Sequence, residues 1–329
     1  YARDLSAPQL GETDLIINQL PGGLYGFDLA EKYGVPMVLA AVIPLARTSA
    51  FPLMGFPKLS IPGYNKATYF LGEQMAWQMF RKVINRWRQQ TLKLPPTPLK
   101  GYFEKLGTRE MPIVNGFSQH AVPRPVDWNE HIHVTGYWFP EHKNWEPAND
   151  LLAFIEAGSP PVFIGFGSMP IKDPQQTTNI ILEALKQNGQ RGILHMGWGG
   201  LGNQSLPDNV FKIDYAPYDW LFPRMAMAIH HGGSGTTAFG LRSGIPSCVV
   251  SFVFDQHYWG ERIAALGAGP KPIRYKGLTV ERLAEAIRIG TSDSQIRQNA
   301  IELGKKMQAE NGIENALNVF EKMLKSPQR

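Results

Sequence analysis

A glycine-rich segment between a strand pattern and a helix pattern restricts the possible folds of this chain more than any other feature. Residues 226–230 form a short apolar run, and the sequence HHGGSGTT (230–237) leads from it into a helical pattern. Glycine lets a backbone approach a ligand closely, and a helix start presents unpaired N–H groups. The segment therefore predicts an α/β fold with an anion-binding turn at the end of a parallel strand.

Two regions of the chain alternate strand, glycine loop and helix, as α/β domains do. With 329 residues the chain is long enough for about two domains. The polar stretch 139–150 (FPEHKNWEPAND) contains two prolines and no periodicity. We therefore expect a first domain over 1–140, a linker over 141–150 and a second domain over 151–310.

The sequence also predicts individual elements. In the first region they are strand 14–18, loop 21–23, helix 24–33 capped by Gly34, and strand 35–41. In the second region Asp173 and Pro174 begin a helix, and the expected strands are 161–165, 192–196, 210–215, 226–230 and 247–252. Helices are expected over 256–266, 279–289, 294–310 and 312–324.

Residues 70–90 form a helical pattern that has two interpretations. Its apolar side carries Trp77, Phe80, Ile84 and Trp87, and its other sides carry the basic residues Arg81, Lys82, Arg86 and Arg88. The favoured interpretation is a helix packed on the core with a solvated basic face. The alternative is a wall for a lipophilic acceptor, or a contact with a membrane surface.

Composition excludes several classes of protein. Hydrophobic residues make up 43% and charged residues 19%, which is typical of a globular chain. No apolar run is long enough for a membrane span, and Lys and Arg are scattered despite the net charge of +5, so we expect no nucleic-acid partner. The single cysteine, Cys248, favours a reducing compartment, and we expect a cytoplasmic monomer.

The turn after residue 230 has the chemistry of a diphosphate site. Gly233 and Gly235 leave the backbone open, Ser234 and Thr236 add hydroxyl groups, and His231 adds a further donor. The alternative is a tight turn capped by Thr236. The number of donors in this short segment favours a binding function.

A dinucleotide site is a competing interpretation of the same segment. Gly233-x-Gly235-x-x-Ala238 fits the dinucleotide fingerprint, with Asp255 near the expected ribose-binding position. Asp255 is followed by Gln256, however, and this pair offers acceptors and a donor to several sugar hydroxyls. Asp255 could also simply cap the following helix.

Two further loops could complete such a site. Ser168 follows Gly165-Phe166-Gly167 at a strand end, where it could reach the diphosphate or form an ordinary turn. Trp198, within GWGG (197–200), and the run Tyr215-Ala216-Pro217-Tyr218 could contact a nucleobase, although loop aromatics often serve packing.

With these residues identified, the chain resembles the nucleotide-sugar glycosyltransferases of the GT-B fold, in particular the sterol glucosyltransferases. The resemblance runs nearly end to end. The motifs that carry it are AEKYGVP (30–36), PRPVDWNEHIHVTGYWF (123–139), GFGSM (165–169), GWGGL (197–201), DWLFPR (219–224), HHGGSGTTAFGLRSGIP (230–246) and DQHYWGERI (255–263).

The resemblance implies two Rossmann-like parallel-sheet domains facing a central cleft, the first incomplete at its N-terminus, with helix 311–329 crossing back to it. It implies that Ser168, His231, Gly233, Ser234, Gly235 and Thr236 bind the diphosphate of a UDP-sugar. Asp255 and Gln256 would bind the sugar, and Trp198, Tyr215, Ala216 and Pro217 would surround the base. No metal or other cofactor is expected.

The resemblance also implies an inverting transfer of a hexose, glucose in the sterol branch, to a hydroxyl of a lipophilic acceptor, together with a peripheral membrane contact. The general base of such enzymes lies in an early glycine-rich loop, and we expect it upstream of Tyr1. Two alternatives stay open: an NAD-dependent oxidoreductase that uses the glycine turn, and a nucleotide-sugar-binding protein without catalysis.

Overall fold

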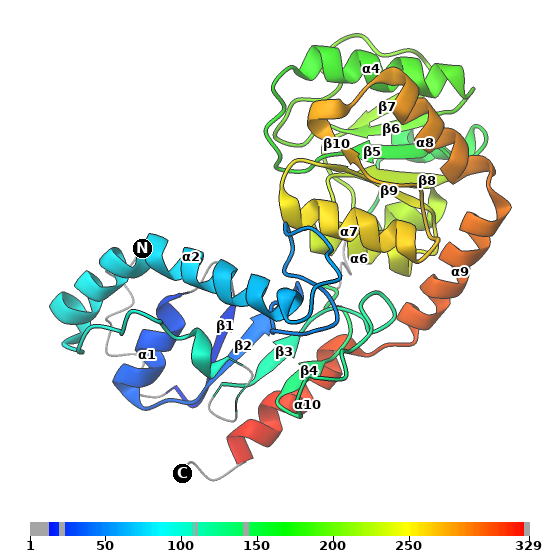
Figure 1. The fold of residues 1–329 in the computed structure, drawn as a ribbon. Helices are drawn as coiled ribbons and strands as arrows, with labels where there is room; N and C mark the ends of the chain where they lie inside the picture. The colour runs from blue at the N-terminus through cyan, green and yellow to red at the C-terminus, as the bar shows by residue number, and fades with distance from the viewer. Residues whose placement is uncertain (1–12, 20–23, 107, 109–110, 141–144, 326–329) are drawn as a thin grey trace. The chain divides into compact units, whose positions relative to one another are not determined.

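The computed structural model describes residues 13–19, 24–106, 108, 111–140 and 145–325. The chain forms two compact units, the first made of Tyr1–Trp138 and Asn311–Arg329 and the second of Phe139–Glu310. Each is an α/β unit with an open, wholly parallel sheet (Figure 1). The predicted loop 21–23 and part of the predicted linker, 141–144, lie outside the described residues.

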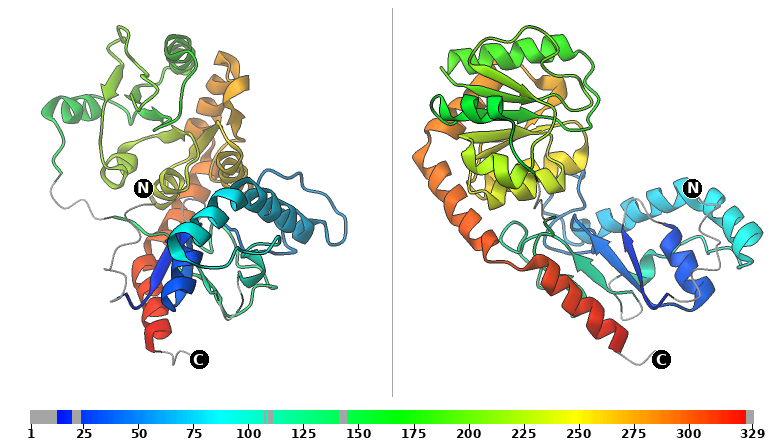
Figure 2. Two further views of the ribbon diagram at one scale, coloured as in Figure 1. Left: turned by 90° about the vertical axis from the view of Figure 1, so that its left-hand side faces the viewer. Right: turned by 180° about the vertical axis from the view of Figure 1, so that it is seen from behind.

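The first unit contains a four-stranded sheet of order β1-β2-β3-β4. Gly34 ends the first helix in the left-handed conformation, with φ of 66°, as its sequence position predicts. The last helix, α10, packs on β2 and β3 through Ala316, Val319 and Phe320, and Figure 2 shows it running beside the sheet. The described elements are β1 (Ile16–Gln19), α1 (Tyr25–Tyr33), β2 (Met37–Ala41), α2 (Tyr64–Trp87), a π-helical turn (Arg88–Leu92), a 3-10 turn (Phe103–Lys105), β3 (Ile113–Asn115), β4 (Ile132–Val134) and α10 (Gly312–Lys325).

The long helix α2 corrects the predicted helix 70–90 in two respects. It begins at Tyr64 and passes at Trp87 into the π-helical turn. Trp77, Ile84 and Trp87 are buried as predicted, but Phe80 is 45% exposed. Apolar residues occur on more than one side of this helix, so periodicity alone could not decide which side faces the core.

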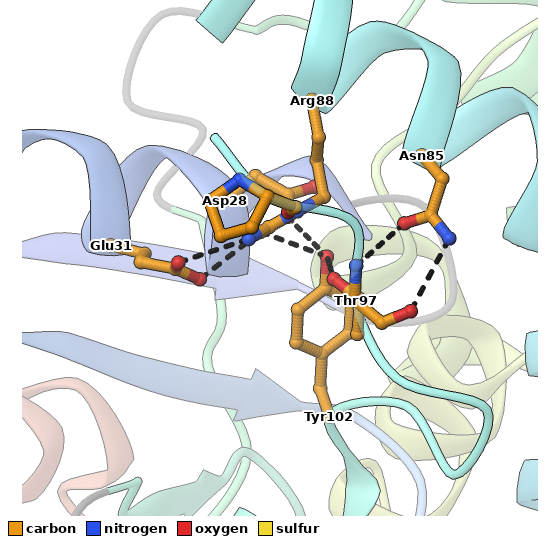
Figure 3. A network of polar contacts seen from close by, with 7 residues as sticks. Asp28, Glu31, Asn85, Arg88, Thr97 and Tyr102 are labelled. Carbon is orange, nitrogen blue, oxygen red and sulfur yellow. Dashed lines mark hydrogen bonds and ion pairs between the residues drawn. The ribbon is translucent and has the colours of Figure 1, made fainter. Parts of the chain in front are cut away.

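Arg88 was predicted on a solvated side of that helix, and this is wrong. Its guanidinium is buried and pairs with Asp28, while Nη2 lies 2.9 Å from Oε1 of Glu31 (Figure 3). The hydroxyl of Tyr102 also donates to Asp28 and accepts from Thr97 at 2.9 Å. Burial raises the pKa of Asp28, and the bonds from Tyr102 and Arg88 oppose this rise. The network joins α1 to the end of α2, and a buried charge requires such partners.

The second unit is built on a six-stranded sheet of order β10-β9-β8-β5-β6-β7 with helices on both faces. Alternate residues of β5 point to opposite faces: Val162 and Ile164 join the core under α4 and α8, whereas Phe163 joins the core under α3 and α5. The described elements are α3 (Asn149–Glu156), β5 (Val162–Gly165), α4 (Pro174–Gln187), β6 (Gly192–His195), β7 (Val210–Ile213), α5 (Tyr218–Leu221), a 3-10 turn (Phe222–Arg224), β8 (Met227–His230), α6 (Ser234–Arg242), β9 (Ser247–Ser251), α7 (Phe254–Ala265), β10 (Ile273–Arg274), a second 3-10 turn (Tyr275–Gly277), α8 (Val280–Ser292) and α9 (Ser294–Gln308).

Local sequence signals decide where several of these helices begin. The carboxylate of Asp173 accepts the N–H of Gln176 at 2.9 Å at the start of α4, as its N-cap position predicts. Asp293 caps α9 in the same way through the N–H groups of Gln295 and Ile296. The short strands β3, β4 and β10 could not be predicted from the sequence, because two or three residues carry little periodicity.

Candidate functional site

The strand order of the second unit defines where its ligand site should lie. β5 comes first in this sheet and pairs with β6 on one side and β8 on the other. The chain therefore proceeds in opposite directions from β5, and ligands of open α/β sheets bind beyond the carboxyl ends of strands at such a switch point. In the register, Gly165 of β5 lies opposite both His195 of β6 and His230 of β8.

The turn after β8 leads directly into α6. Gly233 is the N-cap residue and has no side chain to satisfy the first N–H groups of the helix. Ser234, Gly235 and Thr236 form the first turn, where N–H groups and the helix dipole favour an anion. The capping alternative for Thr236 does not hold, because this residue lies inside the helix and its hydroxyl bonds to Tyr218.

His231 lies between this turn and the loop after β5. A Cβ built on Gly167 would lie 3.2 Å from its Cε1, and one built on Gly233 would lie 2.5 Å from its Nε2. Burial lowers the pKa of His231, Asp255 opposes the shift and His195 adds to it. The ring is therefore a neutral hydrogen-bond donor near pH 7 in the free protein.

The loop after β6 crosses the loop after β5 at close range. The N–H of Trp198 donates to the carbonyl of Gly167 at 3.0 Å. A Cβ on Gly197 would lie 2.3 Å from that carbonyl oxygen, and Gly197 has φ of 55°, so only glycine fits there. The loop after β6 is thereby held on Gly167, which itself lies beside His231. Ser168, which follows Gly167, is exposed.

The candidate nucleobase residues differ in exposure. Trp198 is 88% exposed and Tyr215 is 60% exposed. Ala216 and Pro217 are buried just before α5. The two aromatic side chains are available for stacking, and Ala216 and Pro217 can contribute backbone groups.

Asp255 and Gln256 occupy the first turn of α7. Val253 is the N-cap residue, so the suggestion that Asp255 caps this helix is wrong. The side-chain oxygen of Gln256 instead accepts the N–H groups of Phe252 and Val253, at 2.8 and 3.2 Å, and Gln256 is 3% exposed. Asp255 is electrostatically coupled to His231, so one sugar candidate lies near the diphosphate candidates. Sugar binding by Gln256 stays a prediction. Its side-chain amide would then have to bind the sugar as well as the N–H groups of Phe252 and Val253.

Two further residues join the site: His195, which sequence reasoning missed, and Tyr218, the last residue of the run predicted to contact a nucleobase. Nε2 of His195, at the end of β6, lies 3.0 Å from the carbonyl oxygen of Asp214, and its ring packs near Tyr218. Burial raises the pKa of Tyr218 to about 12, and its side chain bonds to Thr236. A histidine at a strand end directly before the glycine loop 197–200 was the available signal.

A separate apolar cavity of about 170 Å³ lies within the first unit. Its wall is formed mainly by aliphatic and aromatic side chains of α2 and its neighbours, with Glu73 as a charged exception. Glu73 pairs with Arg47, whose Nε lies 3.0 Å from Oε1. The principal apolar lining residues are Leu45, Leu53, Ala76, Phe80, Phe103 and Leu106.

Among the residues with described coordinates, no three His, Cys, Asp or Glu side chains gather in a group that could hold a metal ion. Within the same residues, no helix combines the length and apolarity needed to cross a bilayer.

Solved structures of glycosyltransferases have a fold similar to that of this chain. The calicheamicin glycosyltransferase matches 98% of this chain over 78% of its own, with a TM-score of 0.71 and 18% identity. The glycosyltransferase of kitacinnamycin matches with a TM-score of 0.67 over 98% of this chain and 79% of its own, at 17% identity. The family described as "Erythromycin biosynthesis protein CIII-like, C-terminal domain" matches residues 193–321. The chain has the GT-B fold of glycosyltransferases.

The amino-acid sequence is similar to one particular group of glycosyltransferases. The chain is 40% identical over 305 residues to a sterol 3-beta-glucosyltransferase of Arabidopsis thaliana, covering 90% of this chain and 48% of the relative. A second sterol 3-beta-glucosyltransferase of that plant is 38% identical, with coverages of 96% and 49%. One from Cryptococcus neoformans is 35% identical, with coverages of 94% and 21%. Over nearly its whole length the chain is similar to sterol 3-beta-glucosyltransferases, and it spans about half the length of the plant relatives.

The dinucleotide interpretation is not supported. The glycine fingerprint follows β8, which is the fourth strand of its unit along the chain, whereas a dinucleotide fingerprint follows the first. The relatives in sequence and fold are glycosyltransferases.

Proposed function

We propose that the protein containing this chain transfers glucose from UDP-glucose to the hydroxyl of a sterol, with inversion at the anomeric carbon. The observation that carries the proposal is that loops 165–168 and 231–235 meet at His231 at the switch point of the second unit, while loop 197–200 packs on Gly167. The plant relatives are named sterol 3-beta-glucosyltransferases, which supports this donor and acceptor class.

The leaving diphosphate is the group this site is best suited to stabilise. Its negative charge grows as the bond to the anomeric carbon breaks. The N–H groups at the start of α6 and the ring of His231 are fixed donors for that charge, and Ser168 adds a hydroxyl. Ser234, Gly235 and Thr236 bind through the helix terminus. In this proposal the helix terminus and His231, with no bound metal or other cofactor, provide the charge compensation.

The rest of the donor follows from the surrounding groups. Trp198 and Tyr215 offer exposed rings to uracil, with Ala216 and Pro217 beside them. Asp255 accepts hydrogen bonds from sugar hydroxyls, and Gln256 contributes to the same end of the donor. The acceptor hydroxyl must also lose a proton, and we assign that general base to no described residue.

The apolar cavity of the first unit supports a lipophilic acceptor. Its lining is largely aliphatic and aromatic, and about 170 Å³ accommodates part of a sterol-sized molecule. A sterol partitions into bilayers, so the proposal includes a peripheral membrane contact. We propose a cytoplasmic monomer, in which the buried thiol of Cys248 stays reduced.

Two measurements test this function. Isothermal titration calorimetry compares UDP, UDP-glucose and NAD, and we expect both uridine ligands to bind more tightly than NAD. Mass spectrometry then detects steryl glucoside after the protein is incubated with UDP-glucose and a sterol in neutral detergent. Tighter binding of NAD would contradict the donor assignment. Binding of UDP-glucose without any glycoside product would favour the non-catalytic alternative.

A further inference from the structure

Helix α2 has a second apolar stripe, which faces away from the core of its unit. Leu71, Met75 and Met79 follow one another at intervals of four residues and therefore lie along one side of the helix. They are 49%, 60% and 72% exposed. This stripe is distinct from the buried side that carries Trp77 and Ile84. Exposed apolar residues gathered in this way indicate an interaction surface.

The same stripe continues into basic residues. Lys82 and Arg86 lie three and seven positions beyond Met79, and both are exposed. They line a groove of about 560 Å³ with Arg81, Asn85, Gln89, Gln90 and Pro96. The outward side of α2, the cyan helix of Figure 1, thus combines an apolar half with a cationic half.

Acidic charge is lacking on this side of the helix. Glu73 is the one acidic residue in the sequence of α2. Its side chain is 10% exposed and is paired with Arg47. The exposed charges of α2 are therefore cationic, and they complement an anionic surface.

The composition of this side favours lipid over protein. Protein interfaces are enriched in Met and Arg as well as in aromatic residues, but they are depleted in Lys, so Lys82 is the residue that favours lipid here. Helices that lie in the membrane interface combine Leu-type apolar side chains with Lys and Arg. Met and Leu side chains are flexible enough to enter a fluid layer, and clustered cations are attracted to anionic headgroups.

We infer that α2 docks on an anionic lipid bilayer through Leu71, Met75, Met79, Lys82 and Arg86. The first three side chains enter the boundary between headgroups and acyl chains, and the two cations contact lipid phosphates. The inference goes beyond the membrane contact in the proposed function because it names the surface and the lipid charge. Only the biological role of this surface rests on the proposed function, because vesicle binding requires neither UDP-glucose nor a sterol.

Sedimentation with sterol-free vesicles tests the inference. The protein should bind vesicles of phosphatidylcholine mixed with phosphatidylserine, and added salt should weaken the binding. Removal of both cations (K82Q with R86Q) should weaken it about 30-fold, at about fivefold for each cation. The pair M75E with M79E should weaken it by at least about tenfold, because charged groups cannot enter the apolar layer. Each variant should keep the wild-type thermal midpoint and affinity for UDP.

Matched variants on other exposed helix faces are the controls. I313E with L317E on α10 removes two apolar residues that are 48% and 53% exposed. K305Q with K306Q on α9 removes two exposed cations. Both controls should bind vesicles like the wild type.

Three results would overturn the inference: no binding to anionic vesicles, equal loss in the control variants, or a dimer that the Met75 and Met79 substitutions dissociate. A dimer would assign this face to a second copy of the chain. If vesicles bind as expected but no steryl glucoside forms in detergent, the proposed function fails while this surface stands.

Discussion

Nδ1 of His230 accepts a hydrogen bond from the N–H of Gly232 at 3.1 Å. His230 is fully buried, and burial lowers its pKa to about 3, so the ring stays neutral and its proton is on Nε2. Gly232 has φ of 90°, and a Cβ there would lie 2.6 Å from Cγ1 of Val249. The bond thus fixes the conformation of the turn that leads from β8 to the start of α6.

Two replacements of His230 should distinguish the effect of its hydrogen bond with Gly232 from the effect of its packing in the core. Asn places its amide oxygen close to the position of Nδ1, so H230N should retain most of the UDP affinity. H230L leaves the N–H of Gly232 unsatisfied and should weaken UDP binding by about 1–3 kcal/mol. Calorimetry measures the affinity, and thermal unfolding measures the packing change. Equal UDP affinity in H230L and wild type would show that the bond does not position the turn.

Replacement of His231 tests its contact with the diphosphate. Loss of a hydrogen bond to a charged group should cost H231A about 1.5–3 kcal/mol of UDP binding. H257A is a matched control in the same unit, because Nδ1 of His257 bonds to Ser251. The control should bind UDP like the wild type. An unchanged affinity in H231A would remove this residue from the site.

UDP binding should also depend on pH through His231. Burial holds its pKa below the ordinary value of 6.5 in the free protein, and a bound diphosphate dianion should raise it. Binding then takes up a proton between the two pKa values, so affinity should increase as pH falls through that range. Calorimetry in buffers of different ionisation enthalpy measures the uptake. If H231A takes up the same number of protons, another group is responsible.

Replacement of Asp255 should weaken the binding of UDP-glucose more than the binding of UDP. D255A removes an acceptor for sugar hydroxyls and should weaken UDP-glucose binding by about 1.5–3 kcal/mol. UDP lacks the sugar and should bind with only a small change, which arises from the coupling between Asp255 and His231. The ratio of the two affinities is the measured quantity. Equal losses for both ligands would argue against a sugar contact.

The buried pair of Arg88 and Asp28 should dominate the polar stabilisation of the first unit. R88M leaves the Asp28 carboxylate buried without its charged partner and should lower the free energy of unfolding by about 3–5 kcal/mol. The double variant R88M with D28N removes that uncompensated charge and should recover part of the loss. R288M is the control, since the ion pair of Arg288 with Glu285 is exposed and should contribute little. Denaturant unfolding at neutral pH gives these values, and equal losses in R88M and R288M would contradict the assignment.

Much of the second unit could be predicted from sequence because its signals are local. Asp173 before Pro174 sets the start of α4, and the glycine turn after His230 sets the start of α6. Both depend on residues only a few positions apart. The same local chemistry predicted the diphosphate candidates, which the structure brings together around His231.

The tertiary structure decided what the local patterns left ambiguous. Helix α2 carries apolar residues on two sides, and only its packing shows that Trp77 is buried while Met79 is exposed. Arg88 has the sequence context of a solvated cation, but Asp28, 60 positions away, draws it into a buried pair. The burial of a side chain depends on which distant segments of the chain come into contact, and the periodicity of one helix carries no information about those contacts. Local patterns therefore predicted the longer α/β elements of the second unit and the chemistry of its loops, and the sheet order showed which loops meet.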